Sequence, residues 1–98
     1  MVQKKTTENG VLTAYLSGSL DAVAAPQTEK ELKADLKPIR RLVLDMKELR
    51  FVSSAGLRML LKLHKTMRKK DGLIVTNVNE SIMQVFALTG FTDILRIE

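Results

Sequence analysis

Strand-like and helix-like segments alternate along the whole chain, and only short turns separate them. The clearest helix covers residues 54–70, where apolar residues recur at helical spacing on one face and basic residues on the other. The clearest strand covers residues 42–46, a nearly continuous apolar run typical of a central strand that is covered on both faces. This alternation predicts an α/β fold in which helices pack on a sheet.

Length and composition limit the fold further. With 98 residues, the chain can bury one hydrophobic core, so a single domain over residues 1–98 is expected. No apolar run approaches the roughly 18 residues of a spanning helix, and the first ten residues lack the apolar stretch of a secretory signal. The absence of cysteine suits a reducing compartment. We therefore expect a cytoplasmic protein without membrane insertion.

Turn and helix signals define the first half of the fold. Residues 2–7 and 11–17 are expected to form an antiparallel hairpin, because Asn9-Gly10 is a typical hairpin turn. A first helix is expected over residues 26–37, with one proline in its first turn and another directly after its end. The chain therefore opens with two strands and a helix.

The second half continues the alternation. Gly72 follows the long helix, and residues 73–76 form another apolar strand. Asn79 is a suitable cap for a third helix that ends at Gly90, and residues 92–97 are expected to form a last strand. The predicted order is β-β-α-β-α-β-α-β, and right-handed crossovers would make the later strands parallel.

The long helix has an apolar face and a basic face. The residues expected to be buried are Leu57, Leu60, Leu61 and His64, and those on the opposite side are Arg58, Lys62, Lys65 and Lys69. The basic side is either a solvated surface or a contact that speeds encounter with an acidic partner. Met59 and Leu63 lie at its margin, where they fit the core or an adaptable binding surface equally well.

The formal charge of +5 raises the question of nucleic-acid binding, since clustered basic residues can neutralise phosphates. Aromatic residues make up only 4% of the chain, and base stacking needs exposed rings. All four lie in apolar patterns that indicate core positions, namely Tyr15, Phe51, Phe86 and Phe91. No nucleic-acid partner is expected.

The segment from Ser53 to Gly56 joins a strand to the start of the long helix, so its polar tip falls at the carboxyl edge of the sheet. Partners and ligands often meet α/β sheets at this edge. A serine here can satisfy free backbone N–H groups, and the same groups would stabilise a phosphate attached to it. The small residues Ala55 and Gly56 would leave the hydroxyl open to approach. From the local pattern alone, however, Ser53 and Ser54 could simply cap the helix.

Catalytic and metal sites find little support. His64 is the only histidine, lies in an apolar pattern and has no acid or nucleophile partner, which favours a packing role. Asp21 and Asp45 could approach one edge of the sheet as a carboxylate pair or Mg²⁺ site, but a third ligand is missing. No glycine-rich phosphate loop is present. We expect no enzyme activity, no metal and no cofactor.

Three stretches carry a family resemblance. They are Gly18-Ser19-Leu20-Asp21, the segment from Leu44-Asp45 to Ser54-Ala55-Gly56-Leu57, and the segment from Asn77-Val78-Asn79 to Leu88-Thr89-Gly90-Phe91. Together they resemble the STAS domain, which is shared by bacterial anti-sigma factor antagonists and sulphate transporter tails. The resemblance covers nearly the whole length and implies a mixed β-sheet with packed helices.

The resemblance also implies a modification site. In the family, the serine before a small residue and a glycine is phosphorylated by the partner anti-sigma factor, which is a serine kinase. That serine is Ser54 here. Ser53, which stands where the family often has aspartate, is the second choice. Asp21 matches the family's acidic residue near the phosphorylation site. Ser53 and Gly56 are also expected to lie near the phosphorylated serine.

An anti-sigma factor antagonist would dock on an anti-sigma factor and free a sigma factor. Phosphorylation would add about −1.5 to −2 charges and prevent docking, and a PP2C-type phosphatase would remove the phosphate. The expected contact residues are Ser54, Ala55, Arg58, Met59, Lys62 and Leu63. The alternative is a structural subunit of a transporter or multiprotein complex, in which Ser54 mainly caps the helix.

Overall fold

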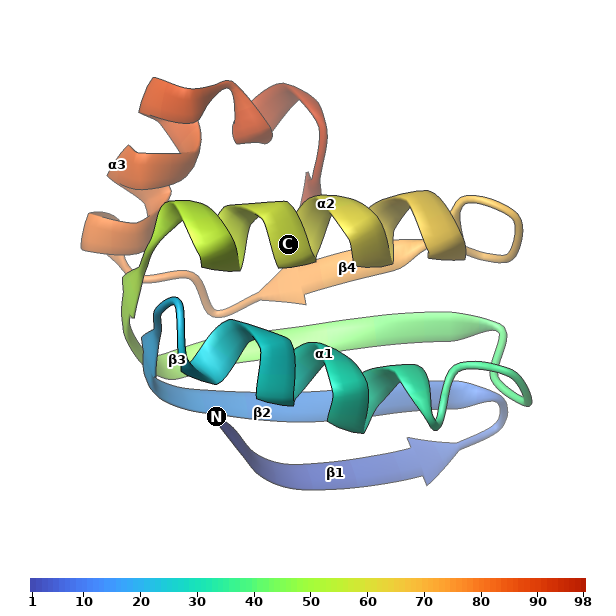
Figure 1. Ribbon diagram of the computed structural model, residues 1–98. Helices are drawn as coiled ribbons and strands as arrows, with labels where there is room; N and C mark the ends of the chain where they lie inside the picture. Colours follow the sequence, from blue (N-terminus) through green and yellow to red (C-terminus); the bar gives the residue numbers. More distant parts are fainter.

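The computed structural model describes residues 1–98, which form one five-stranded sheet and three α-helices (Figure 1). The strands are β1 (Val2–Glu8), β2 (Val11–Leu20), β3 (Arg41–Val52), β4 (Leu73–Thr76) and β5 (Arg96–Ile97). The helices are α1 (Ala24–Lys33), α2 (Ser54–Met67) and α3 (Glu80–Thr89), and a short 3₁₀ turn, η1 (Phe91–Asp93), follows α3. The predicted element order is confirmed.

The sheet keeps the strands in chain order, from β1 to β5. β1 pairs with β2 antiparallel, and the later neighbours pair in parallel, as predicted. The predicted hairpin turn is also present, because Asn9 and Gly10 have φ values of 53° and 79°, the left-handed backbone that a tight two-residue turn requires. β2 is longer than expected and continues to Leu20.

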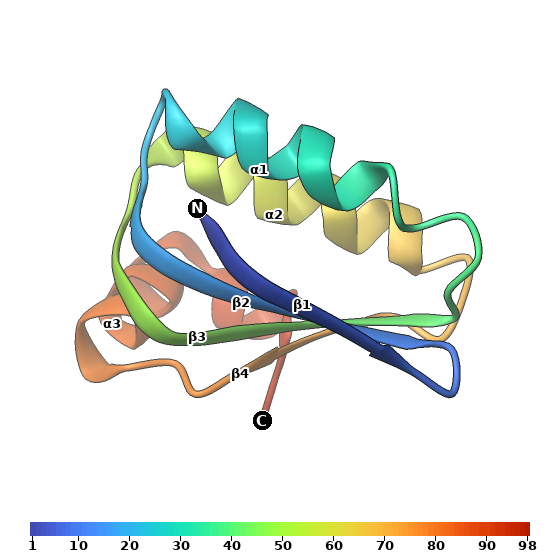
Figure 2. The ribbon, with the colours of Figure 1, turned by 90° about the horizontal axis from the view of Figure 1, so that it is seen from below.

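Helices α1 and α2 lie side by side on one face of the sheet (Figures 1 and 2). Each follows a strand of the same direction, so both helices begin at the carboxyl edge of the sheet and run the same way. The core between these layers is aliphatic, and its fully buried members include Leu12, Leu16, Leu32, Leu42, Leu44, Leu60 and Leu63. No helix has both the length and the apolar content to cross a membrane.

The central strand β3 differs from the prediction of a strand covered on both faces. It alternates along its first half, with Leu42, Leu44 and Met46 buried and Val43 and Asp45 only half-buried. The strand also continues well past residue 46. α3 packs against this later part and lies apart from α1 and α2 (Figure 2).

The two helices on the sheet end earlier than expected. α1 runs from Ala24 to Lys33, where residues 26–37 were predicted, and α2 ends at Met67. Beyond α2, the Lys70 Nζ donates hydrogen bonds to the carbonyl oxygens of Leu36, Lys37 and Ile39 at 2.5, 2.9 and 2.8 Å. The ammonium therefore fastens the turn after α1 to the end of α2, and no further helical turn is formed there.

The predicted last strand over residues 92–97 is largely wrong. Only Arg96 and Ile97 pair with β4, and Phe91–Asp93 form η1 instead. Gly90, with φ 81°, ends α3, and the Phe91 ring then stacks on Phe86 with 6.2 Å between ring centroids. The chain thus turns back onto α3, where Phe91 packs, instead of extending along β4 from residue 92.

Candidate functional site

The junction between β3 and α2 is anchored to the end of β2 by one carbonyl oxygen. The backbone N–H and the hydroxyl of Ser53 both donate to the carbonyl oxygen of Leu20, each at 3.0 Å. The same hydroxyl accepts a hydrogen bond from the Gly56 N–H at 3.3 Å and so caps α2. Ser53, rather than Ser54, is therefore the capping residue, and its hydroxyl is fully engaged in structure.

Ser54 is the first residue of α2 and its side chain is exposed. Its hydroxyl has no hydrogen-bond partner within the chain, and the first turn of the helix carries no acidic residue. The backbone N–H groups at a helix start lack intrahelical acceptors and create a positive field there. The structure thus presents a free hydroxyl at a position that favours negative charge.

Gly56 serves packing rather than access. It is buried, and a Cβ at this position would lie 2.6 Å from the Leu20 carbonyl oxygen and 3.0 Å from Cγ1 of Val52. Only glycine allows α2 to come this close to the end of β2. The expectation that Gly56 opens the approach to Ser54 is therefore wrong, because its backbone faces the core.

Asp21 directly follows Leu20, so it lies at the same sheet edge as Ser53. Its carboxylate accepts hydrogen bonds from the backbone N–H groups of Val23 at 3.1 Å and Ala24 at 2.8 Å. The bond from Ala24 is the main cause that lowers the pKa of Asp21. The carboxylate is thus ionised at neutral pH and closes the turn into α1.

Asp45 does not share that edge, so the carboxylate pair of Asp21 and Asp45 that was considered and disfavoured from the sequence is not formed. Asp45 pairs with Tyr15, five residues or about 17 Å before the end of β2 at Leu20. Its carboxylate accepts from the Lys47 N–H at 3.0 Å and from the Asn77 side-chain amide at 2.8 Å. It stabilises the connection between β3 and β4. Nowhere do three or more acidic, histidine or cysteine side chains gather closely enough to hold a metal ion.

The buried side of α2 is rotated from the predicted one. Its buried residues are Gly56, Met59, Leu60, Leu63 and Met67, whereas Leu57, Leu61 and His64 are only half-buried. Apolar residues surround most of this helix, so its sequence alone fits two orientations. The close contact of Gly56 with β2 and the packing of α1 against α2 select the one observed.

This rotation changes the set of expected contact residues. Ser54, Arg58 and Lys62 are exposed and follow one another at spacings of four, so they share one side of α2. Ala55 is half-buried. Met59 and Leu63 are 1% and 2% exposed, so their placement on a contact surface is corrected to the core. They come near the surface only as the floor of two hollows between α1 and α2.

The hollow nearer to Ser54, here called the apolar hollow, has a volume of about 300 Å³. Its walls are mostly small apolar residues from the start of α1 and the turn before it, namely Ala22, Ala25 and Pro26, together with Ala55 and Met59 of α2. Glu29, Arg58 and Lys62 complete its lining. Sequence patterns missed this site, because it exists only where two helices meet.

Two exposed apolar side chains lie at the same end of the molecule. Val23 precedes α1 and is 72% exposed, and Phe51 near the end of β3 is 51% exposed. The prediction that Phe51 lies in the core is wrong, because β3 turns Leu49 and Val52 inward and leaves both residues between them outside. Of the other aromatic residues, Phe86 is buried and Tyr15 is half-buried.

Comparisons with known proteins agree with this geometry. The family model of the STAS domain matches residues 3–98. BtrV of Bordetella bronchiseptica, a candidate anti-sigma factor antagonist, is 37% identical over 91 residues, which cover 91% of this chain and 78% of BtrV.

Solved structures give the same fold. An anti-sigma factor antagonist from Mycobacterium paratuberculosis matches 96% of this chain and 81% of its own, with 25% identity and a TM-score of 0.86. The Bacillus cell fate determinant SpoIIAA in its phosphorylated form matches 100% of this chain and 91% of its own, with 18% identity and a TM-score of 0.75. The chain is therefore a member of the STAS domain family, with relatives that are named anti-sigma factor antagonists.

Proposed function

We propose that this protein is an anti-sigma factor antagonist whose docking is switched by phosphorylation of Ser54. The observation that carries the proposal is that two adjacent serines differ in their hydrogen bonding. Ser53 uses its hydroxyl to cap α2 and to bind the Leu20 carbonyl, whereas the Ser54 hydroxyl is exposed and free. A kinase can modify Ser54 without breaking a structural hydrogen bond.

Ser53 is the poorer acceptor for a physical reason. A phosphate on its oxygen would remove the proton that bonds to Leu20 and would crowd the Gly56 N–H. Both contacts hold the start of α2 against β2, so modification there would disturb the fold. Ser54 therefore takes the role of acceptor, and Asp21 and Ser53 hold the surrounding loops in place.

The unmodified surface around Ser54 suits docking. Val23 and Phe51 expose apolar surface, and the apolar hollow lies between the starts of α1 and α2. Burying such surface favours association, while Arg58 and Lys62 at the margin add charge that can orient a partner. The partner in this proposal is an anti-sigma factor that is itself a serine kinase, and its capture frees a sigma factor.

Phosphorylation would change this surface without unfolding it. The modification adds about −1.5 to −2 charges at the start of α2, where the free N–H groups stabilise negative charge. Arg58, four residues further on, lies on the same side of the helix and can pair with the phosphate. Docking would then require desolvating a charged group. A loss of ~3 kcal/mol weakens binding by roughly two orders of magnitude.

In this proposal the chain is a binding protein and substrate rather than an enzyme, and it acts in the cytoplasm. ATP belongs to the kinase, and a separate PP2C-type phosphatase restores the docking state. The names of the relatives support the partner class. For one member of the fold, SpoIIAA, both an unphosphorylated and a phosphorylated form have been solved.

Phosphate mapping tests the proposal. The protein is incubated with Mg-ATP and anti-sigma factor kinases from its host, and the modified residue is identified by mass spectrometry. We expect phosphate on Ser54 in the unaltered protein and in Ser53→Ala, and none in Ser54→Ala. Phosphate on Ser53 would overturn the assignment. Absence of any modification, with a transporter as the co-purifying partner, would favour a structural subunit instead.

A further inference from the structure

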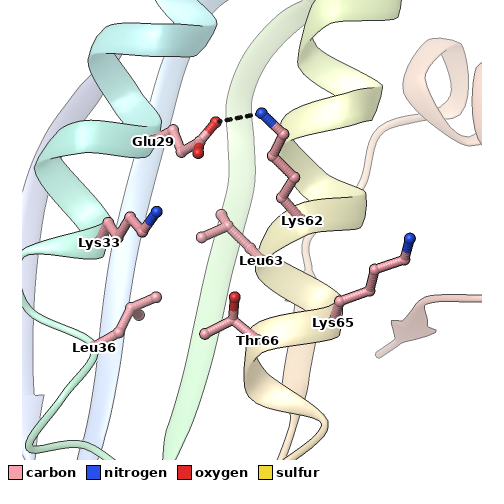
Figure 3. A pocket seen from close by; sticks show the side chains of 7 residues that line it. All are labelled: Glu29, Lys33, Leu36, Lys62, Leu63, Lys65 and Thr66. Carbon is pink, nitrogen blue, oxygen red and sulfur yellow. Dashed lines mark ion pairs between the residues drawn. The ribbon is translucent and has the colours of Figure 1, made fainter.

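A second hollow continues the groove between α1 and α2 away from Ser54 (Figure 3). It has a volume of about 260 Å³ and shares Glu29 and Lys62 with the apolar hollow, so the two hollows adjoin at this ion pair. Lys33 lies at its rim, Lys65 lines it with its ammonium group turned away from α1 (Figure 3), and Leu36 and Leu63 form its floor. We call it the basic hollow.

The distribution of carboxylates makes this hollow strongly positive. Glu31 and Asp35 lie near Lys5 of β1, with their oxygens 3.8 and 2.7 Å from its Nζ. Their negative charges therefore lie on the side of α1 that faces β1, and they do not neutralise the lysines of the groove. Glu29 is the only acidic residue that lines either hollow, and its Oε1 lies 3.8 Å from the Lys62 Nζ. Three lysines and one glutamate thus line the basic hollow; the ammonium groups of Lys33 and Lys62 face the space between the helices, whereas that of Lys65 points away from α1 (Figure 3).

We propose that the basic hollow receives an acidic segment of the protein that docks at Ser54, and that Glu29 competes with this segment for Lys62. The inference rests on the proposed function and adds the chemistry of the partner. The two hollows adjoin at Glu29 and Lys62, between the same two helices, so one docked surface can reach both. Its apolar floor suits a polypeptide that offers aliphatic as well as acidic side chains.

In the unbound protein, the Glu29 carboxylate occupies the position beside Lys62 that a carboxylate of the partner would take. Its contact with Lys62 is long, and the Lys62 side chain is 68% exposed, so the pair is weak and an incoming carboxylate can replace it. Charges at the rim of an interface act mainly on the rate of encounter. The basic hollow would therefore guide the partner, while the surface around Ser54 decides whether it stays.

A peptide titration followed by NMR tests this site. The ¹⁵N-labelled protein is titrated at low salt with a ten-residue glutamate peptide and, separately, with inorganic tripolyphosphate. We expect the peptide to shift the amide signals of residues lining the groove. Lys33→Gln/Lys65→Gln should weaken peptide binding about fivefold. The control Lys30→Gln/Lys69→Gln removes the same charge from α1 and from the turn just after α2, at two exposed residues that line neither hollow, and should change binding less than about twofold.

A second pair of variants tests whether Glu29 competes with the peptide for Lys62. Glu29→Gln should tighten peptide binding about two- to fivefold, whereas Glu31→Gln, two residues away on α1 but beside Lys5, should have little effect. Equal effects of the two glutamate variants, or of the two lysine pairs, would show unspecific attraction and overturn the inference. So would tripolyphosphate that shifts the same amides at lower concentration than the peptide.

Partner binding separates this inference from the proposed function. If Ser54→Asp loses the anti-sigma factor but Lys33→Gln/Lys65→Gln associates at the unaltered rate, the basic hollow is not used and the Ser54 switch stands. If Lys33→Gln/Lys65→Gln associates about tenfold more slowly while the Ser54 variants bind normally, the acidic contact is supported and the phosphorylation switch at Ser54 is rejected.

Discussion

The hydroxyl of Ser53 donates a hydrogen bond to the carbonyl oxygen of Leu20 over 3.0 Å and thereby ties the first turn of α2 to the end of β2. This contact places the neighbouring Ser54 outside the structural network. The proposed switch depends on that separation, because charge added to Ser54 alters a surface and leaves the supporting bonds intact.

The two serines should differ in their effect on stability. Ser53→Ala removes the cap and the bond to Leu20, so the free energy of unfolding should fall by about 1–2 kcal/mol. Ser54→Ala should stay within about 0.5 kcal/mol of the unaltered protein, since its side chain is exposed. Urea denaturation gives both values. Equal losses for the two variants would contradict the assignment of Ser53 as the cap.

The sign of the stability change in Gly56→Ala tests whether α2 approaches β2 as closely as the structure shows. Helix propensity alone predicts a gain of about 1 kcal/mol for alanine over glycine. The new Cβ would lie 2.6 Å from the Leu20 carbonyl oxygen, however, and overpacking typically costs about 1–3 kcal/mol. Because the neighbour is backbone, we expect a net loss of stability in thermal denaturation. A raised melting temperature would show that α2 does not approach β2 this closely.

Lys70 should stabilise the turn between α1 and β3. Lys70→Met keeps most of the aliphatic chain but removes three hydrogen bonds to the carbonyl groups of Leu36, Lys37 and Ile39. We expect a loss of about 1.5–3 kcal/mol and faster amide hydrogen exchange in this turn. The adjacent Lys69→Met, which removes an exposed ammonium, is the control. Similar losses in both variants would argue against the Lys70 contacts.

Asp21 should make stability depend on pH. Its pKa is lowered in the folded state, chiefly by the hydrogen bond from Ala24, so the ionised form stabilises the fold. This contribution is present above the unfolded pKa of about 4 and is lost as the pH falls through the folded pKa. Asp21→Asn should therefore be less stable than the unaltered protein at pH 7, with a smaller difference at pH 3. A difference independent of pH would contradict the role of the charge.

Local signals in the sequence predicted most of the architecture. Asn9 and Gly10 have the backbone that their turn type demands, and Asn79 and Gly90 bound α3 as expected. Such signals act through neighbouring residues and can be read without tertiary information. The last strand was mispredicted because Phe91 packs on Phe86, a tertiary contact that local strand preference does not contain.

The candidate site was predicted only in part. The exposed position of Ser54 follows from its place between a strand and a helix. The buried side of α2 does not, since Gly56 must first meet Leu20 before the helix orientation is fixed. Nor can sequence reveal that Glu29 and Lys62 face each other across a groove, because they lie on different helices.

The central claim is that negative charge on Ser54 prevents docking. Isothermal titration of an anti-sigma factor from the host with Ser54→Ala and Ser54→Asp, both checked for unchanged unfolding free energy, measures it most directly. We predict that Ser54→Ala binds within about twofold of the unaltered protein and that Ser54→Asp binds about tenfold or more weakly. Equal affinity of the alanine and aspartate variants would contradict the account.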